Sequence, residues 1–234
     1  MGRQPSSVRE RLWLLAHDEY NDLRPRINVR ALDIGLAAAA LVDLLLWDRI
    51  KIAGGLVYVN LDNRGTLGDP IARDVLRVIF QGPAPRLAEV LHEARAELLG
   101  GAPSPFQDLY QHTRAVLVAG GYLSEQRRLL WGTRYTLADS TLIFSIRGQV
   151  NHALVVYPRE ASSLANDCLI ALVWALELHS RLPMPYSTSE AEPILNAITG
   201  AIPRHAGEES PVTVVPHLMQ LVRHAVGDLA TAAF

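Results

Sequence analysis

The sequence predicts a mainly α fold, a single-domain bundle in which amphipathic helices surround buried central helices, with short β-hairpins. Two segments, 31–47 and 168–178, are apolar on every side, which is typical of helices that have no solvent-facing side. Other segments repeat apolar residues at helical spacing between caps, glycines and prolines. No repeat or linker divides the chain, so we predict one domain over 1–234, with 1–7 flexible.

The first third of the chain contains two predicted helices and a hairpin. A short helix is expected over 9–16, followed by an irregular link at 21–30 that carries three arginines. The apolar helix 31–47 comes next. Two β-rich runs then flank Gly54-Gly55, and this pattern predicts a tight hairpin.

The middle of the chain contains several residues that predict where helices begin and end. Asp69-Pro70 supplies a cap and a first-turn proline, so a helix begins there. A second helix is predicted over 86–99. A third should run from Ser104-Pro105 to Gly120-Gly121.

The last part of the chain is also predicted to be helical. Helices are expected over 139–157, within 162–181, over 189–201 and over 211–232, with prolines at several of the ends. The single cysteine, Cys168, lies in the apolar run and reads as an inert core thiol. One cysteine cannot form an internal disulfide, which fits a reducing compartment.

Composition excludes several classes. The N-terminus lacks the apolar region of a signal peptide, and the longest apolar run, 34–46, is too short to span a bilayer. We therefore expect a cytoplasmic protein. The net charge of −2 and the lack of a basic recognition helix argue against nucleic acid as a partner. Residues 1–159 hold 19 basic and 16 acidic side chains, a small excess that suits either an anionic partner or an ordinary solvated surface.

No recognisable catalytic motif is present, whether for phosphate binding, dinucleotide binding, a serine nucleophile or a zinc protease. His217 and His224 share a helix face but have no further ligand at metal spacing, so no metal site or cofactor is expected. The stretch 17–19, His-Asp-Glu, reads as a surface turn. We predict that the chain is not an enzyme, and a site built from residues distant in sequence is the alternative left open.

The most informative stretch is residues 123–135, LSEQRRLLWGTRY. Leu129, Leu130 and Trp131 are consecutive, and three arginines flank them: Arg127, Arg128 and Arg134. At a hairpin tip, such a group could enter the acyl boundary of a membrane while the arginines meet anionic headgroups. It could equally pack in a dimer contact or against its own domain.

Several segments occur in an order that resembles the Golgi phosphoprotein 3 family, including its bacterial members. RERLWLLAHD precedes GLAAAALVDLLLWDRIKI, which carries the mid-helix acidic residue Asp43. LGDP at 67–70, LVAGGYL at 117–123 and the apolar hairpin at 129–137 follow in the same order as in the family. The resemblance covers about residues 8–234.

The resemblance implies a mainly helical fold, no catalysis and peripheral membrane binding. Eukaryotic relatives bind phosphatidylinositol 4-phosphate in a basic pocket that contains a tryptophan, and they act as adaptors that hold glycosyltransferases. Their hairpin tip is a membrane wedge. By this likeness Leu129, Leu130 and Trp131 would insert into an anionic membrane surface.

This sequence departs from the family at the headgroup pocket. The position of the pocket tryptophan falls near Asn28, and Ala37 replaces an arginine. Gln107, Tyr110 and His112 stand at the other arginine positions. Arg26, Arg30 and Arg114 could substitute for them or be ordinary surface residues.

Two hypotheses follow. The first is a peripheral membrane protein that binds anionic lipid or phosphoinositide headgroups, with a membrane-associated enzyme as a second partner. The second is a soluble interaction module that has lost lipid binding and self-associates, as a homo-oligomer, through the hairpin.

Overall fold

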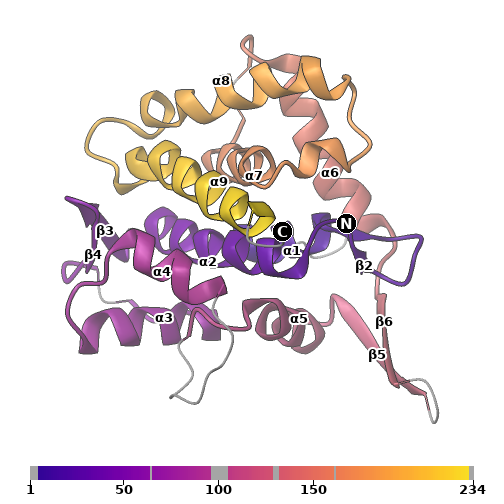
Figure 1. The fold of residues 1–234 in the computed structure, drawn as a ribbon, viewed down its shortest axis with the longest axis horizontal. Helices are drawn as coiled ribbons and strands as arrows, with labels where there is room; N and C mark the ends of the chain where they lie inside the picture. The colour runs from indigo at the N-terminus through magenta and orange to yellow at the C-terminus, as the bar shows by residue number, and fades with distance from the viewer. Residues whose placement is uncertain (1–4, 64, 96–104, 129–131, 161, 232–234) are drawn as a thin grey trace.

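In the computed structural model, residues 5–63, 65–95, 105–128, 132–160 and 162–231 are described, and they form a predominantly helical fold (Figure 1). The central helices are α1 (Val8–Leu15), α2 (Val29–Leu46) and α7 (Leu164–Ala175). The surrounding elements are α3 (Pro70–Gln81), α4 (Leu87–Arg95), α5 (Leu109–Ala119), α6 (Thr141–Val156), α8 (Thr188–Ala206), α9 (Val215–Thr231) and the 3-10 turns η1 (Leu178–Ser180) and η2 (Pro211–Val214). The predicted mainly α fold class is confirmed.

Helix α2 lies at the centre and contacts α1, α3, α4, α5, α7 and α9. In Figure 1, α3 and α5 lie below α2, and α7 and α8 lie above it. Gly35 allows one of the closest approaches, because an added Cβ would lie 2.5 Å from a Cδ atom of Leu176. Both predicted core helices are buried, and residues from α1 to α9 join in one hydrophobic core.

The Gly54-Gly55 hairpin also forms as predicted. Strands β3 (Ile50–Ala53) and β4 (Leu56–Val59) pair antiparallel in the register Ile50 to Val59. Gly54 and Gly55 both have positive φ, the geometry of the two-residue turn that fits the twist of a hairpin. Asp69 caps α3 as predicted, because its side chain accepts a hydrogen bond from the amide of Ile71.

Three expectations about local structure are wrong. Residues 105–108 form a turn, and α5 begins only at Leu109, because Asp108 takes a left-handed conformation with φ 53°. The apolar helix of the C-terminal half ends at Ala175, since Glu177 is also left-handed and a 3-10 turn follows it. The link expected to be irregular contains a short strand: β2 (Arg24–Pro25) pairs with β1 (His17–Asp18).

Candidate functional site

The hairpin of β5 (Leu123–Arg128) and β6 (Gly132–Leu137) extends away from the helical body (Figure 1). Its register runs from Leu123 opposite Leu137 to Arg128 opposite Gly132. Arg127 and Arg128 therefore end the strand that leads to the tip. The tip itself, with Leu129, Leu130 and Trp131, lies outside the described residues.

Two arginine contacts join the middle of this hairpin to the body. The guanidinium of Arg114, on α5, lies 4.1 Å from the ring centroid of Tyr135 on β6. Arg134, one strand position before Tyr135, forms an ion pair with Asp22 in the β1–β2 turn. The middle of the hairpin thus contacts both the preceding helix α5 and the β1–β2 turn, which is more than 100 residues away in sequence.

The segment expected to be a surface turn begins with a buried histidine, so that prediction is wrong for His17. The His17 ring stacks on Trp13 with a centroid distance of 3.7 Å, and its Nε2 lies 3.1 Å from the hydroxyl of Tyr110. Burial lowers the pKa of His17 to about 4, and the nearby charges of Arg114 and Arg26 also lower it. His17 therefore belongs to an aromatic cluster inside the fold.

Arg26 is held by carboxylates. Its Nη2 lies 2.7 Å from Glu19, whose other oxygen accepts a 2.9 Å hydrogen bond from Arg147. Burial opposes ionisation of Glu19, yet hydrogen bonds from its own backbone and from the two arginines hold its pKa below the ordinary value. The positive charge of Arg26 is thus already compensated by these carboxylates, which leaves it less able to attract a phosphate.

The positions that match the family's headgroup pocket are not basic here. Ala37 is fully buried in α2, and the backbone amide of Tyr110 donates a 2.7 Å hydrogen bond to the carboxylate of Asp33. Burial raises the pKa of Asp33 to about 6. Arg30 lies on the exposed first turn of α2. Three arginines were predicted to substitute for the arginines of the family's pocket. Two of them, Arg26 and Arg114, lie close enough to His17 to lower its pKa.

An exposed aromatic pair lies at the same end of the molecule. Tyr20, in the β1–β2 turn, is 80% exposed, and Phe144, on α6, is 41% exposed. Their rings meet edge to face at 6.1 Å, and the Arg147 guanidinium lies 4.9 Å from the Phe144 centroid. Sequence reasoning missed this pair, since the two residues are 124 positions apart and neither lies in a motif. With the β5–β6 hairpin it forms what we call the hairpin end.

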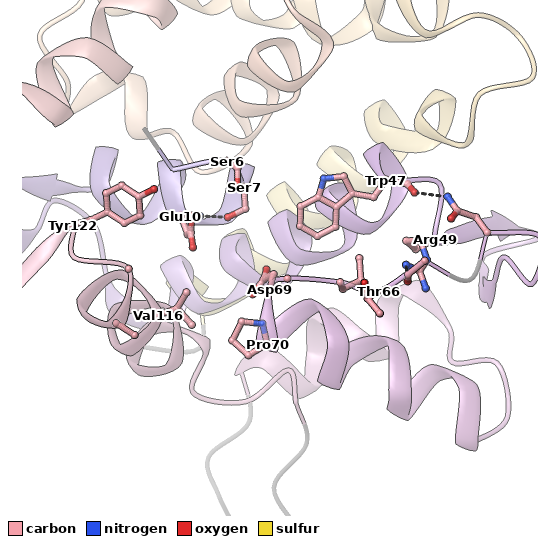
Figure 2. Close-up of a pocket in the computed structure, with 16 residues that line it drawn as sticks. Ser6, Ser7, Glu10, Trp47, Arg49, Thr66, Asp69, Pro70, Val116 and Tyr122 are labelled. Carbon is pink, nitrogen blue, oxygen red and sulfur yellow. Dashed lines mark hydrogen bonds between the residues drawn. The ribbon is translucent and has the colours of Figure 1, made fainter. Parts of the chain in front are cut away.

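A second candidate is a cleft of about 710 Å³ between the start of α1, the loop before α3 and the end of α5 (Figure 2). Figure 2 shows Glu10 and Tyr122 at one end of the cleft and Trp47 and Arg49 at the other, with Asp69 between them. No residue of the cleft was among the predicted site residues.

Titratable groups beside the cleft hold the fold together. Buried Arg9 contacts Asp69 at 3.0 Å, and the carboxylate of Asp43 accepts hydrogen bonds from the first amides of α1. Burial raises the pKa of Asp43 to about 7, against the opposing effect of Arg9, and burial also raises the pKa of Glu10. These groups connect α1, α2 and the start of α3, which assigns them a structural role.

Neither metal ligands nor a membrane span was found in the described ranges. No group of three or more histidine, cysteine, aspartate or glutamate residues could hold a metal ion there. His217 and His224 are exposed on α9, and burial strongly raises the pKa of the Cys168 thiol. No helix among the described residues is long and apolar enough to cross a membrane.

The fold and the hairpin end define a class of protein, a mainly α domain from which a β-hairpin projects. A comparison with known families matches residues 8–229 to Golgi phosphoprotein 3 (GPP34), so the chain belongs to that family. The family resemblance seen in the sequence is confirmed. No curated protein matches the chain.

Proposed function

We propose that the protein is a non-enzymatic peripheral membrane protein, located in the cytoplasm, that binds anionic lipid, including phosphoinositides, through the hairpin end. In this proposal Leu129, Leu130 and Trp131 enter the membrane and the surrounding arginines meet the headgroups. A membrane-associated enzyme would be the second partner of such an adaptor. Membership of the Golgi phosphoprotein 3 family supports the proposal.

The observation that carries the proposal is the combination of a projecting hairpin and an exposed aromatic pair. Tyr20 and Phe144 add to one surface the kind of amphipathic ring that concentrates at membrane interfaces. Arg147 beside Phe144 and Arg134 in the middle of the hairpin add guanidinium groups to that surface, where Glu19 and Asp22 pair with them. Aromatic rings with adjacent arginines suit a membrane that carries anionic lipid.

Charge alone would give weak binding. Segments 17–26 and 123–147, which make up most of the hairpin end, contain six arginines and five carboxylates. An attraction worth about 1 kcal/mol per basic residue is therefore largely offset by the repulsion between the carboxylates and an anionic membrane. Full burial of one large apolar side chain is worth about 1.5–3 kcal/mol, so the tip should supply most of the membrane affinity.

The competing hypothesis is a soluble module that self-associates through the same hairpin. An exposed apolar group suits a second protein surface as well as a bilayer. The two hypotheses differ in what the tip touches, so one double variant can separate them.

The test is liposome flotation across a panel from pure phosphatidylcholine to mixtures with phosphatidylglycerol and phosphatidylinositol 4-phosphate. The wild type should float only with anionic vesicles, and the L130S/W131S variant should stay at the bottom with an unchanged melting temperature. A variant that floats normally would overturn the proposal. A variant that changes from dimer to monomer in light scattering, with a wild type that never floats, would favour the soluble module.

A further inference from the structure

A second groove lies at the opposite end of the molecule from the hairpin, between strand β4 with its following loop and helix α3 (Figure 1). Its volume is about 540 Å³, within the range of small-molecule sites. Its walls combine aliphatic and aromatic side chains with three arginines: Val59, Leu61, Leu76, Phe80, Arg49, Arg73 and Arg77. Asn60 and Asn63 complete the lining.

Arg49 is the unusual member of this lining. It is only 8% exposed, and its Nη1 donates to the carbonyl oxygen of Gly65. Its buried Nε has no hydrogen-bond partner, and no carboxylate pairs with the guanidinium within the described part of the chain. A buried cation without an anion is costly. The groove wall therefore carries a positive charge that an anionic ligand would compensate.

The exposed face of α3 supplies the other charged and apolar side chains of the groove wall. Arg73, Leu76, Arg77 and Phe80 recur at helical spacing and turn toward one groove. Phe80 is 66% exposed, which is unusual for a phenylalanine without a covering partner. Arg77 lies 3.0 Å from Asp74, but both side chains are more than half exposed, so the pairing is weak.

We propose that this groove binds an amphiphilic anion, a single apolar chain that ends in a carboxylate or phosphate. The anionic end pairs with Arg49 and Arg73, and the chain covers Leu61, Leu76 and Phe80. A purely polar anion would leave the apolar wall exposed to water, and an uncharged chain would leave Arg49 unpaired. The ligand can come from free fatty acids or from single-chain lysophospholipid, which share this chemistry.

The experiment is calorimetry at low ionic strength with dodecanoate below its micelle concentration. Dodecanol, dodecyltrimethylammonium and acetate separate the roles of chain and charge. We expect one dodecanoate per chain and binding of the other three at least about tenfold weaker. A lost charge-assisted hydrogen bond accounts for a factor of that size for dodecanol and dodecyltrimethylammonium. For acetate the loss of apolar burial along the chain does so. Dodecanoyl lysophosphatidylglycerol, also below its micelle concentration, distinguishes lysophospholipid from fatty acid as the source.

Two variants on the exposed face of α3 test the residues without disturbing the core. Arg73→Ala and Phe80→Ser should each weaken dodecanoate binding, Arg49→Met should abolish it, and Arg204→Ala on distant α8 should leave it unchanged. Circular dichroism checks that each variant is folded. Equal binding of dodecyltrimethylammonium, or full binding by the Arg73 and Phe80 variants, overturns the proposal, as does binding of an acidic peptide but not dodecanoate. These assays contain no bilayer, so their outcome is independent of membrane binding by the hairpin.

Discussion

The carboxylate of Asp43, in the last turn of α2, accepts a 2.7 Å hydrogen bond from the backbone amide of Val8, the first residue of α1. The amide of Arg9 donates to the same carboxylate at 3.2 Å. Helix N-termini leave such donors without intrahelical partners, and all of α1 is buried. Asp43 thus caps one central helix from within another.

Replacement of Asp43 by alanine should therefore leave two buried amides without an acceptor. We expect Asp43→Ala to lower the free energy of unfolding by about 1–3 kcal/mol in urea titrations. Asp62→Ala, at an exposed loop position, is the control and should change it by less than about 0.5 kcal/mol. Equal stability of the two variants would mean that the cap contributes little.

The buried His17 should make stability depend on pH. Its folded-state pKa, about 4, lies below the ordinary 6.5, so the unfolded chain binds the extra proton between these values. His17 therefore stabilises the fold above pH 6.5, and this contribution is lost as the pH falls toward 4. Asp33 and Asp43 have raised pKa values and oppose this trend, so the comparison should be between the wild type and His17→Leu.

The stability gap between the wild type and His17→Leu should shrink by about 3 kcal/mol from pH 7 to pH 4. Urea unfolding at a series of pH values measures the gap. A gap that stays constant across this range would show that His17 does not change its protonation preference on folding.

The close contact between Gly35 and Leu176 leads to a prediction about packing. Gly35→Ala should reduce the free energy of unfolding by about 1–3 kcal/mol, because the added methyl group would meet the Leu176 side chain. Gly148→Ala, on α6, is the matched control. Its Cβ meets nothing within 4 Å, so it should stabilise by up to about 1 kcal/mol. If Gly35→Ala were as stable as Gly148→Ala, α2 would not be closely packed at this point.

The headgroup chemistry at the hairpin end should be unspecific. Ala37, at a position where the family resemblance implies an arginine, is buried, and Arg26 is paired with Glu19. Calorimetry with soluble inositol 1,4-bisphosphate should show no micromolar one-to-one complex at physiological salt. Binding to anionic vesicles should weaken steeply as salt shortens the Debye length from about 10 Å at 0.1 M to about 3 Å at 1 M. A salt-resistant complex would instead point to a built pocket.

The sequence predicted the elements that depend on local signals. The all-round apolar pattern of α2, the Gly54-Gly55 turn and the Asp69 cap each act over a few residues, and the structure has all three. The start of α5 was missed because Ser104-Pro105 resembles a helix start, whereas the left-handed Asp108 delays the helix.

The long-range partners of buried arginines could not be predicted in the same way. Arg9 and Arg11 are both buried, and their hydrogen-bond partners Asp69 and Asn166 are 60 and 155 residues away. Nothing local distinguishes such an arginine from a solvated one. The Tyr20–Phe144 pair was missed for the same reason, because its two residues are far apart in sequence. The lipid-binding roles of Arg26 and Arg114 stay predictions.

The central claim is that the tip at 129–131 enters anionic membranes, and an environment-sensitive label can test it directly. The only native cysteine, Cys168, is fully buried, so a Trp131→Cys variant would carry an NBD label at the tip alone. With vesicles containing phosphatidylglycerol, the NBD emission should rise several-fold and shift to the blue, while a label at exposed Glu208→Cys stays unchanged. Vesicle-bound protein whose tip label shows no change would contradict the account.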